Sequence, residues 1–220
     1  MARHRLTVIA LSDTHDRHER IRVPIGDILI HAGDFTNYGT SEEIEDFLRW
    51  FGSMPHKHKV LVAGNHESGL DPRDRRYGKS MLLLQRKYPD IVYLENESVY
   101  IEGLHIYGSP MTPKGIAFGY APGSRAEKQI WSKIPKDVDI LVTHVPPFKI
   151  LDLTRFGEHA GSKELAKRLL TDVKPALHIF GHCHESRGTI TRNGTVFCNA
   201  ANVHDDHSIQ GFGLAFERTS

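Results

Sequence analysis

Residues 6–15 read LTVIALSDTH, a run of apolar and β-branched residues that ends abruptly in a polar turn. Such a run is typical of a central strand in a sheet that is covered on both faces. The layout recurs at 28–32, 59–63, 139–142 and 176–180, followed by Gly33-Asp34, Gly64-Asn65-His66-Glu67, Thr143-His144 and Gly181-His182-Cys183-His184. The repetition predicts buried strands that each end in a turn carrying Asp, Asn or His.

Helical patterns alternate with these strands. They cover residues 41–51, 75–87, 124–133 and 161–173, and the first begins with a Ser cap and acidic residues. Strand-like stretches without helices between them lie at 91–94, 98–109, 187–191, 195–199 and 211–217, so part of the sheet should be antiparallel. We therefore predict an α/β fold, a layered sandwich of two mixed β-sheets flanked by helices. It should be a single domain over residues 1–220, since no repeat or linker divides the chain.

The composition is that of an ordinary globular protein, with 39% hydrophobic residues, 25% charged residues and a formal net charge of +1. So small a net charge provides no global attraction to nucleic acid or to an anionic membrane. Cys183 and Cys198 are too few for a disulfide framework, and no stretch approaches the length of a membrane span. We expect a cytoplasmic protein without a membrane partner. The sequence does not indicate its oligomeric state.

The polar residues at the strand ends are of the types that bind metal ions. Groups just beyond the carboxyl ends of strands converge on the ligand crevice of an α/β sheet. A single carboxylate such as Asp34 can bridge two ions about 3.5–4 Å apart, and imidazole nitrogens suit Mn, Fe and Zn alike. The predicted metal ligands are Asp13, His15, Asp34, Asn65, His144, His182 and His184.

These blocks resemble those of the calcineurin-like metallophosphoesterases in order and approximate spacing. The resemblance covers the chain from about Asp13 to His184, and it rests on Asp13-x-His15, Gly33-Asp34, Gly64-Asn65-His66-Glu67, His144 and Gly181-His182-x-His184. Each block is common by itself, whereas five in order at predicted strand ends are specific. The compact length and the segments Gly108-Ser109-Pro110 and His144-Val145-Pro146-Pro147 resemble the small metallophosphoesterase-domain proteins of the fetal brain protein 239 group.

The resemblance implies roles for the individual residues. Two divalent ions would be bound, one by Asp13, His15, Asp34 and His184, and the other by Asp34, Asn65, His144 and His182. A hydroxide between the ions would attack phosphorus in line. His66 would be the catalytic residue outside the ligand set, binding a phosphate oxygen or protonating the leaving alkoxide, unless it only orients a ligand. Of Mn, Fe and Zn, we favour Mn as the cofactor.

The residues after Asp34 bear on the substrate. In the phosphoprotein-phosphatase branch, Asp-Arg follows and clamps phosphate, whereas here Phe35-Thr36-Asn37-Tyr38 follows. The resemblance therefore favours a small phosphodiester, such as a cyclic nucleotide. The alternatives are a phosphomonoesterase or protein phosphatase at the same site, a nuclease, which the low net charge disfavours, and an inert scaffold, which should have lost ligands. A nucleotide base could stack on Tyr38, Phe118 or Tyr120.

Other polar residues near the blocks have plainer interpretations. Glu67 is expected to be structural, in a salt bridge beneath the site, and Cys183 to point away from the metals, because alternate residues of an extended segment face opposite ways. His31 and His178 lie inside apolar strands and are expected to be hydrogen-bonded groups of the core. His204-Asp205-Asp206-His207 matches no block and is interpreted as a solvated loop.

Overall fold

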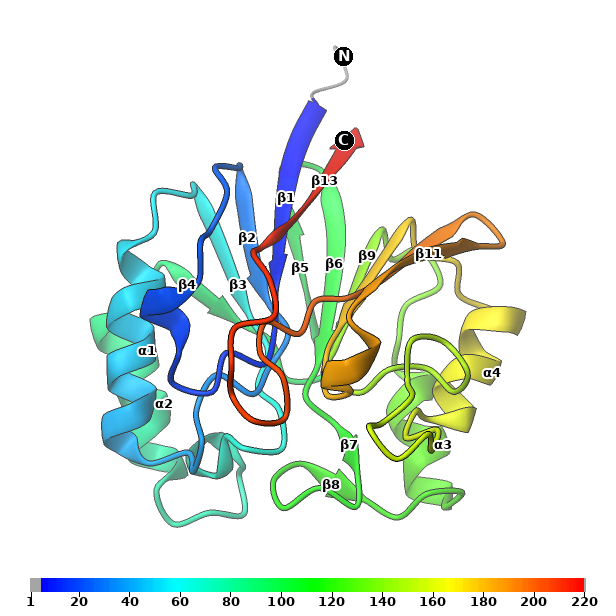
Figure 1. Cartoon of the computed structure of the whole chain (residues 1–220), viewed down its shortest axis with the longest axis horizontal. Coiled ribbons are helices and arrows are strands. Elements are labelled where there is room, and N and C mark those ends of the chain that lie inside the picture. The colour runs from blue at the N-terminus through cyan, green and yellow to red at the C-terminus, as the bar shows by residue number, and fades with distance from the viewer. Residues whose placement is uncertain (1–4, 220) are drawn as a thin grey trace.

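Two large β-sheets pack face to face in the computed structural model, which describes residues 5–219 (Figure 1). The first sheet has the strand order β13-β1-β2-β3-β4. Its strands are β1 (Arg5–Leu11), β2 (Ile28–His31), β3 (His58–Leu61), β4 (Ile91–Tyr93) and β13 (Leu214–Thr219). Strands β1 to β4 are parallel, and β13 pairs with β1 in the antiparallel sense.

The second sheet has the order β11-β12-β10-β9-β6-β5. Its strands are β5 (Glu97–Ile101), β6 (Leu104–Ser109), β9 (Ile140–Thr143), β10 (Leu177–Phe180), β11 (Gly188–Arg192) and β12 (Thr195–Asn199). The four central strands are parallel, and a hairpin adds an antiparallel strand at each edge. A short parallel pair, β7 (Thr112–Pro113) and β8 (Gly119–Tyr120), was not predicted.

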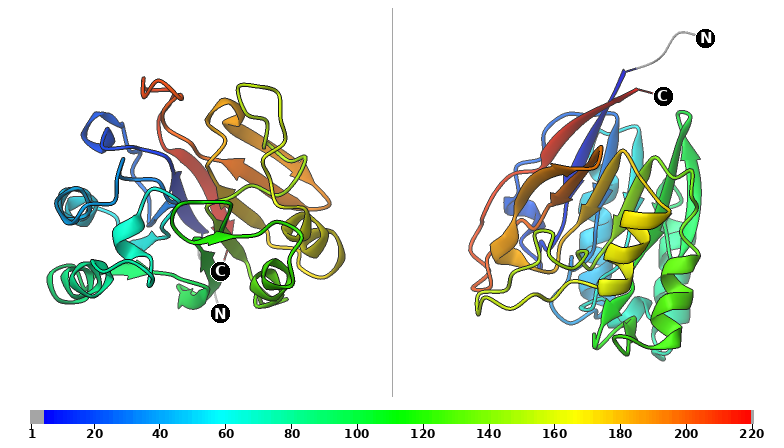
Figure 2. Two further views of the ribbon diagram at one scale, coloured as in Figure 1. Left: turned by 90° about the horizontal axis from the view of Figure 1, so that it is seen from below. Right: turned by 90° about the vertical axis from the view of Figure 1, so that its right-hand side faces the viewer.

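The sheets meet through an apolar layer to which both contribute, including Val8 and Ile30 from the first sheet and Ile140 and Ile179 from the second. Helices α1 (Ser41–Ser53) and α2 (Tyr77–Lys87) cover the outer face of the first sheet, and α3 (Arg125–Ser132) and α4 (Lys163–Thr171) cover that of the second (Figure 2). The central strands are thus buried on both faces, which explains their continuous apolar runs. The predicted sandwich of two mixed sheets flanked by helices is confirmed.

Side-chain caps set where the helices begin. Helix α1 is capped by Thr40 rather than by Ser41, in a reciprocal capping box with Glu43. Helix α2 begins at Tyr77, two residues later than predicted, because the carboxylate of Asp74 accepts the backbone N–H of Arg76 at 2.8 Å and holds that segment in a turn. Local side-chain to backbone bonds therefore compete with the first helical turn.

The stretch 98–109 folds back on itself as the hairpin of β5 and β6. Glu102 and Gly103 connect the strands with φ of 49° and 82°, the two positive values that a two-residue hairpin turn requires. Both cysteines are free and buried. No helix among residues 5–219 is long and apolar enough to cross a bilayer.

Candidate metal centre

The turns after β1, β2, β3, β9 and β10 bring all of the predicted ligands to one edge of the sandwich, at the lower ends of the strands in Figure 1. Parallel strands end at a common edge, so their following turns are neighbours. A β-bridge between Ser12 and Ala201 joins the two sheets there. The topology thus gathers residues that are up to 171 positions apart, from Asp13 to His184 (184 minus 13).

The first group consists of Asp13, His15 and His184, whose ligand atoms all lie within 4.8 Å of one another. Nε2 of His184 lies 3.3 Å from Oδ1 of Asp13 and 3.4 Å from Nε2 of His15. The carbonyl of Thr36 lies 3.1 Å from Nδ1 of His15 and can accept its proton, which leaves Nε2 available for a cation. The resemblance assigned these three residues to one ion.

The second group consists of Asp34, His144 and His182, with the same 4.8 Å limit between ligand atoms. Nε2 of His144 lies 3.1 Å from Oδ2 of Asp34 and 3.1 Å from Oδ1 of Asn65, so the amide of Asn65 joins this group. Nδ1 of His144 lies 2.9 Å from the carbonyl of Ala32, a contact that fixes the ring. The resemblance assigned these four residues to the other ion.

Asp34 lies between the two groups. Besides its contact with His144, its Oδ2 is 4.0 Å from Nε2 of His15 and 4.0 Å from Nε2 of His66. The side chain of His66 is 38% exposed, and its Nδ1 lies 2.7 Å from the carbonyl of Asn37, which can accept its proton. His66 therefore presents Nε2 to the centre from the solvent side, where a substrate would approach.

Carboxylates and imidazoles compensate each other's charge in this centre. Burial would raise the pKa of Asp13, but the hydrogen bond and the charge of His184 outweigh it and lower the pKa to about 2. Burial disfavours charged imidazoles, yet Asp34 raises the pKa of His144 to about 9, and Asp13 raises that of His184 to about 9. Two carboxylates thus attract two protons here, so the centre has a strong affinity for positive charge.

The other two imidazoles of the centre are neutral. Burial is the largest effect at His15 and His182, and it lowers the pKa of each to about 4. Anionic carboxylates and neutral imidazoles are the states that bind divalent cations, and such cations would replace the protons of His144 and His184. The donor set therefore fits a pair of divalent ions.

The backbone is strained at the candidate ligands. Asp13, His15, Asp34 and His182 have φ of 51°, 41°, 53° and 68°, values that cost non-glycine residues about 1–3 kcal/mol each and cluster at functional sites. Close packing adds to the constraint. A Cβ atom at Gly181 would lie 1.9 Å from Oδ2 of Asp13. The turn of the Gly-His block therefore has no room for a side chain.

Glu67 connects two of the ligand-bearing turns. Its buried carboxylate accepts the backbone N–H groups of Asp34 at 2.8 Å, Thr36 at 2.9 Å and Gly64 at 2.6 Å, and also the Thr36 hydroxyl at 2.9 Å. Burial, followed by the charge of Asp34, raises its pKa to about 7. The structural role was predicted, but the partners are backbone amides rather than a salt-bridge cation.

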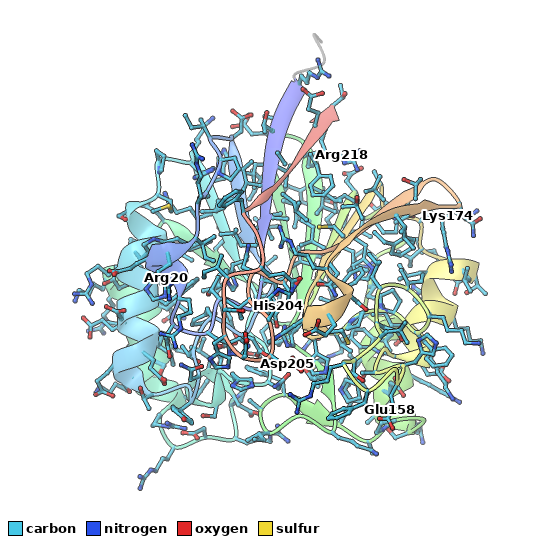
Figure 3. The ribbon with its side chains drawn as sticks, viewed as in Figure 1. Arg20, Glu158, Lys174, His204, Asp205 and Arg218 are labelled. Carbon is cyan, nitrogen blue, oxygen red and sulfur yellow. The ribbon has the colours of Figure 1, made fainter. Side chains whose placement is uncertain are left out.

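The loop before β13 contributes two residues that the sequence did not assign to the site. Oδ1 of Asp205 lies 3.3 Å from Nδ1 of His184, and the ring of His207 stacks on that of His15 with centroids 5.0 Å apart. Figure 3 labels Asp205 and its neighbour His204 in this loop. Asp205 and Asp206 are both exposed and His207 is half-buried, so the loop is solvated as interpreted, but the interpretation missed the contacts of Asp205 with His184 and of His207 with His15. The only sequence signal for these two contacts was the presence of Asp residues between the histidines of the segment 204–207.

The remaining residues near the blocks lie in the core. Sγ of Cys183 donates to the carbonyl of Asp152 at 3.4 Å, and Cys183 belongs to none of the three His and carboxylate groups found within residues 5–219. Nε2 of His31 contacts the Thr14 hydroxyl at 3.2 Å, and Nε2 of His178 contacts the Thr143 hydroxyl at 2.8 Å. Burial raises the pKa of the Cys183 thiol far above its ordinary value, so it is a poor thiolate ligand.

A cavity of about 600 Å³ reaches the centre at His182 and provides room for a ligand. Its lining includes the cations Lys114 and Lys163 and the aromatic rings of Phe148 and His159.

The fold and the site together define the class of this protein. It is a metal-binding domain built as a two-sheet α/β sandwich, with Asp, Asn and His side chains clustered at its strand ends.

The chain belongs to the calcineurin-like phosphoesterase family, whose model matches residues 6–186. The human metallophosphoesterase domain-containing protein 1 is 37% identical in an alignment of 211 positions that covers 88% of this chain and 65% of the relative, so the chain spans somewhat less than two thirds of that relative's length. A UPF0046 protein of Caenorhabditis elegans is 38% identical over 96% of this chain and 74% of its own length. The resemblance inferred from the strand-end blocks is thus confirmed.

The fold is shared with solved structures of low sequence identity. The phosphopantetheinyl hydrolase of Mycobacterium tuberculosis aligns with 94% of this chain and 89% of its own at a TM-score of 0.56 and 18% identity.

Proposed function

We propose that this chain is a dinuclear metal-dependent phosphodiesterase that hydrolyses small phosphodiesters such as cyclic nucleotides. The observation that carries the proposal is the position of Asp34, which clusters with His144 and His182 on one side and with His15 and His66 on the other. Two divalent ions would share it, one held also by Asp13, His15 and His184, and the other by Asn65, His144 and His182. We favour Mn²⁺ because the donors combine carboxylates, an amide and imidazoles without a thiolate.

When bound, the two ions supply an activated water and stabilise charge on the phosphoryl oxygens. His66 would bind a phosphate oxygen or protonate the leaving alkoxide through Nε2. Burial alone would lower the pKa of His66, but the charge of Asp34 and the hydrogen bond to the Asn37 carbonyl raise it. A raised pKa increases the protonated fraction near neutrality, which suits a proton donor. The carbonyl of Asn37 thus orients His66. The Asp-Arg pair of the phosphoprotein-phosphatase branch is absent from this loop.

The preference for a diester rests on the loop after Asp34. Residues 35–40 include neither Lys nor Arg, and Phe35 is fully buried in the core against Phe47, with ring centroids 4.2 Å apart. Within residues 5–219, neither Lys nor Arg forms an ion pair with Asp13 or Asp34. A monoester dianion has more charge to neutralise than a diester monoanion, and the latter fits a centre without an arginine clamp.

A nucleotide base would most readily meet Tyr38. Phe118 and Tyr120 are buried, whereas Tyr38 is 77% exposed and directly follows Asn37, the partner of His66. If Tyr38 stacks on the base, Tyr38→Ala should raise KM for cyclic AMP and leave KM for dimethyl phosphate unchanged. Equal effects on both substrates would remove the nucleotide from the proposal.

The cytoplasmic location stays a prediction, which imaging of a tagged chain would test.

The proposal is tested with Asp34→Asn and His144→Ala, with Asp206→Asn from the neighbouring loop as the matched control. We expect both site variants to lose Mn²⁺-dependent hydrolysis of bis(p-nitrophenyl) phosphate and to bind less metal by elemental analysis. The control should keep both. Hydrolysis of p-nitrophenyl phosphate under the same conditions distinguishes a diesterase from a monoesterase. Full activity of Asp34→Asn would refute the shared-ligand assignment.

A further inference from the structure

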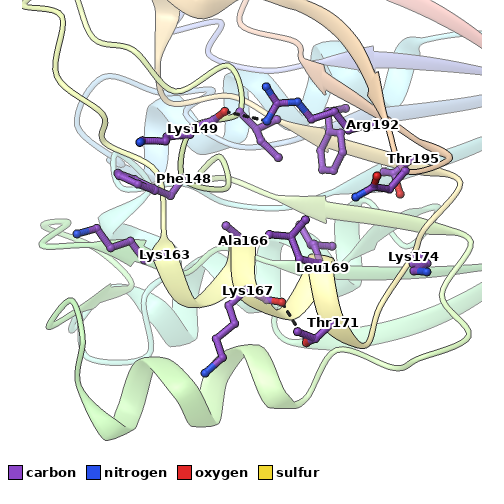
Figure 4. Close-up of a pocket in the computed structure, with 14 residues that line it drawn as sticks. Phe148, Lys149, Lys163, Ala166, Lys167, Leu169, Thr171, Lys174, Arg192 and Thr195 are labelled. Atoms are coloured by element: carbon purple, nitrogen blue, oxygen red, sulfur yellow. Dashed lines mark hydrogen bonds between the residues drawn. The ribbon is translucent and has the colours of Figure 1, made fainter.

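A second cavity, of about 560 Å³, lies between α4, residues 148–150 and the hairpin of β11 and β12 (Figure 4). Its lining includes none of the seven candidate metal ligands. Phe148 and Lys163 line both this cavity and the one that reaches His182. The second cavity is therefore a neighbour of the metal centre but is not part of it.

The floor of the cavity is apolar. It is formed by the buried side chains of Ile150, Ala166, Leu169 and Phe197, and the 61% exposed Leu170 extends this surface to the rim. Apolar side chains that face an opening lose stabilisation unless something covers them. The volume lies within the range of pockets that enclose small molecules, so a ligand of that size can provide the cover.

The rim of the cavity is cationic. Five exposed cations line it, and the lining contains neither Asp nor Glu; the five are Lys149, Lys163, Lys167, Lys174 and Arg192. None of the five forms an ion pair with a residue of the described range 5–219, although eight other Lys and Arg residues do. Like charges held together without a counter-charge repel one another, and an anion relieves that repulsion.

Contacts within the rim hold three of these cations at residues 148 and 149. The Nζ atoms of Lys149 and Lys163 lie 5.6 Å and 5.1 Å from the ring centroid of Phe148. Arg192 donates to the carbonyl of Lys149 at 3.5 Å, the contact drawn as a dashed line in Figure 4. Three of the five cations are thus gathered around residues 148 and 149 on one side of the cavity.

We propose that this cavity binds a single-chain anionic amphiphile, with the alkyl chain on the apolar floor and the anionic head at the rim. A small hydrophilic anion would leave the floor uncovered, and a neutral hydrocarbon would leave the cations uncompensated. A membrane surface fits less well, because insertion into a bilayer needs protruding apolar side chains, whereas four of the five named here are buried in a hollow. The occupant is independent of the substrate of the metal centre.

The test is isothermal titration of the full chain with laurate below its micellar concentration, with dodecanol, dodecyltrimethylammonium and acetate as comparison ligands. We expect one saturable laurate site, weak binding of dodecanol and acetate, and none of the cationic amphiphile. Lys149→Glu combined with Arg192→Glu should weaken laurate binding about tenfold or more, because attraction becomes repulsion at the rim. Lys79→Glu, an exposed lysine on α2, is the control and should bind as the wild type does.

Two further variants distinguish laurate binding in this cavity from binding elsewhere on the chain. Ala166→Leu fills the floor without changing charge and should also weaken laurate binding, with its fold checked by circular dichroism. Asp34→Asn should bind laurate normally, and a loss there would mean that the carboxylate sits on the metals and would overturn the proposal. Equal binding by the double rim variant and by Lys79→Glu would overturn it as well. So would binding to phosphatidylserine vesicles without saturable laurate binding, since that behaviour belongs to a membrane-contacting surface.

Discussion

Oδ1 of Asp205 lies 3.3 Å from Nδ1 of His184, while Nε2 of the same imidazole lies 3.3 Å from Oδ1 of Asp13. Nδ1 of His184 makes no hydrogen bond within residues 5–219, so Asp205 acts on the imidazole through its charge, which increases the basicity of the ring. Asp205→Asn keeps the shape but removes the charge, so we expect the affinity for Mn²⁺ to fall about tenfold. Competition with a chelator measures the Mn²⁺ affinity of both proteins. Asp206→Asn, whose native side chain accepts the N–H of Ser208, is the control, and equal affinities would exclude the role.

Replacing Glu67 by Gln should destabilise the protein. Each carboxylate oxygen of Glu67 accepts two hydrogen bonds, so an amide NH₂ at either position faces donors that it cannot satisfy. One mismatched buried group costs about 1–3 kcal/mol. Urea denaturation of the metal-free protein should show a lower midpoint, with the exposed Glu42→Gln variant unchanged. A wild-type midpoint for Glu67→Gln would mean that the two turns are held by other contacts.

A methyl group at Gly64 or Gly181 should impair metal binding through contact with the carboxylates. A Cβ atom would lie 2.3 Å from Oδ1 of Asp34 at Gly64 and 1.9 Å from Oδ2 of Asp13 at Gly181. Either carboxylate must move, so Gly64→Ala and Gly181→Ala should bind less Mn²⁺ by elemental analysis while staying folded by circular dichroism. Gly78→Ala on α2 meets nothing within 4 Å and should keep its metal. Full metal content in all three variants would show that the carboxylates are not displaced from the ions.

The sequence predicts the fold well because its signals are local and repeated. Strands β2, β9 and β10 are buried at every position, so each appears as a nearly continuous apolar run, apart from His31, Thr143 and His178. The ligand candidates follow directly from the strand ends, because parallel strands place successive turns at one edge. The proximity of Asp13 and Asp34, which follow the parallel neighbours β1 and β2, can therefore be predicted from the order of strands and turns, whereas that of Asp13 and His182 depends on how the two sheets pack.

The parts that escaped prediction depend on contacts between distant segments. Asp205 reaches His184 only because β13 returns along β1 and carries the preceding loop past the strand ends. The structural role of Glu67 was predicted, but its hydrogen bonds to three backbone N–H groups in two separate turns were not. Both sets of contacts join segments that are distant in sequence, so the partners leave no periodic pattern along the chain.

His178 is a buried neutral group whose titration should make stability depend on pH. The Thr143 hydroxyl donates to the carbonyl of Val145 at 2.7 Å, so it must accept from Nε2–H of His178 at 2.8 Å. Nδ1 then carries no proton and has no hydrogen-bond partner among the described residues. Burial lowers the pKa of His178 to about 3. Protonation at Nδ1 would place a charge in the core with nothing to compensate it.

The unfolded chain protonates His178 near its ordinary pKa of 6.5, whereas the native protein binds that proton only near pH 3. The unfolded state therefore binds more protons below pH 6.5, and the contribution of a neutral His178 is complete above this pH and is lost as the pH falls. His178→Gln keeps a donor for Thr143 but cannot be protonated. We expect the wild type's stability relative to this variant, in metal-free protein, to be constant above pH 7 and to decrease by about 1.4 kcal/mol per pH unit below 6.5. Urea midpoints between pH 5 and 8 measure the difference, and a constant difference throughout would show that His178 is not kept neutral in the core.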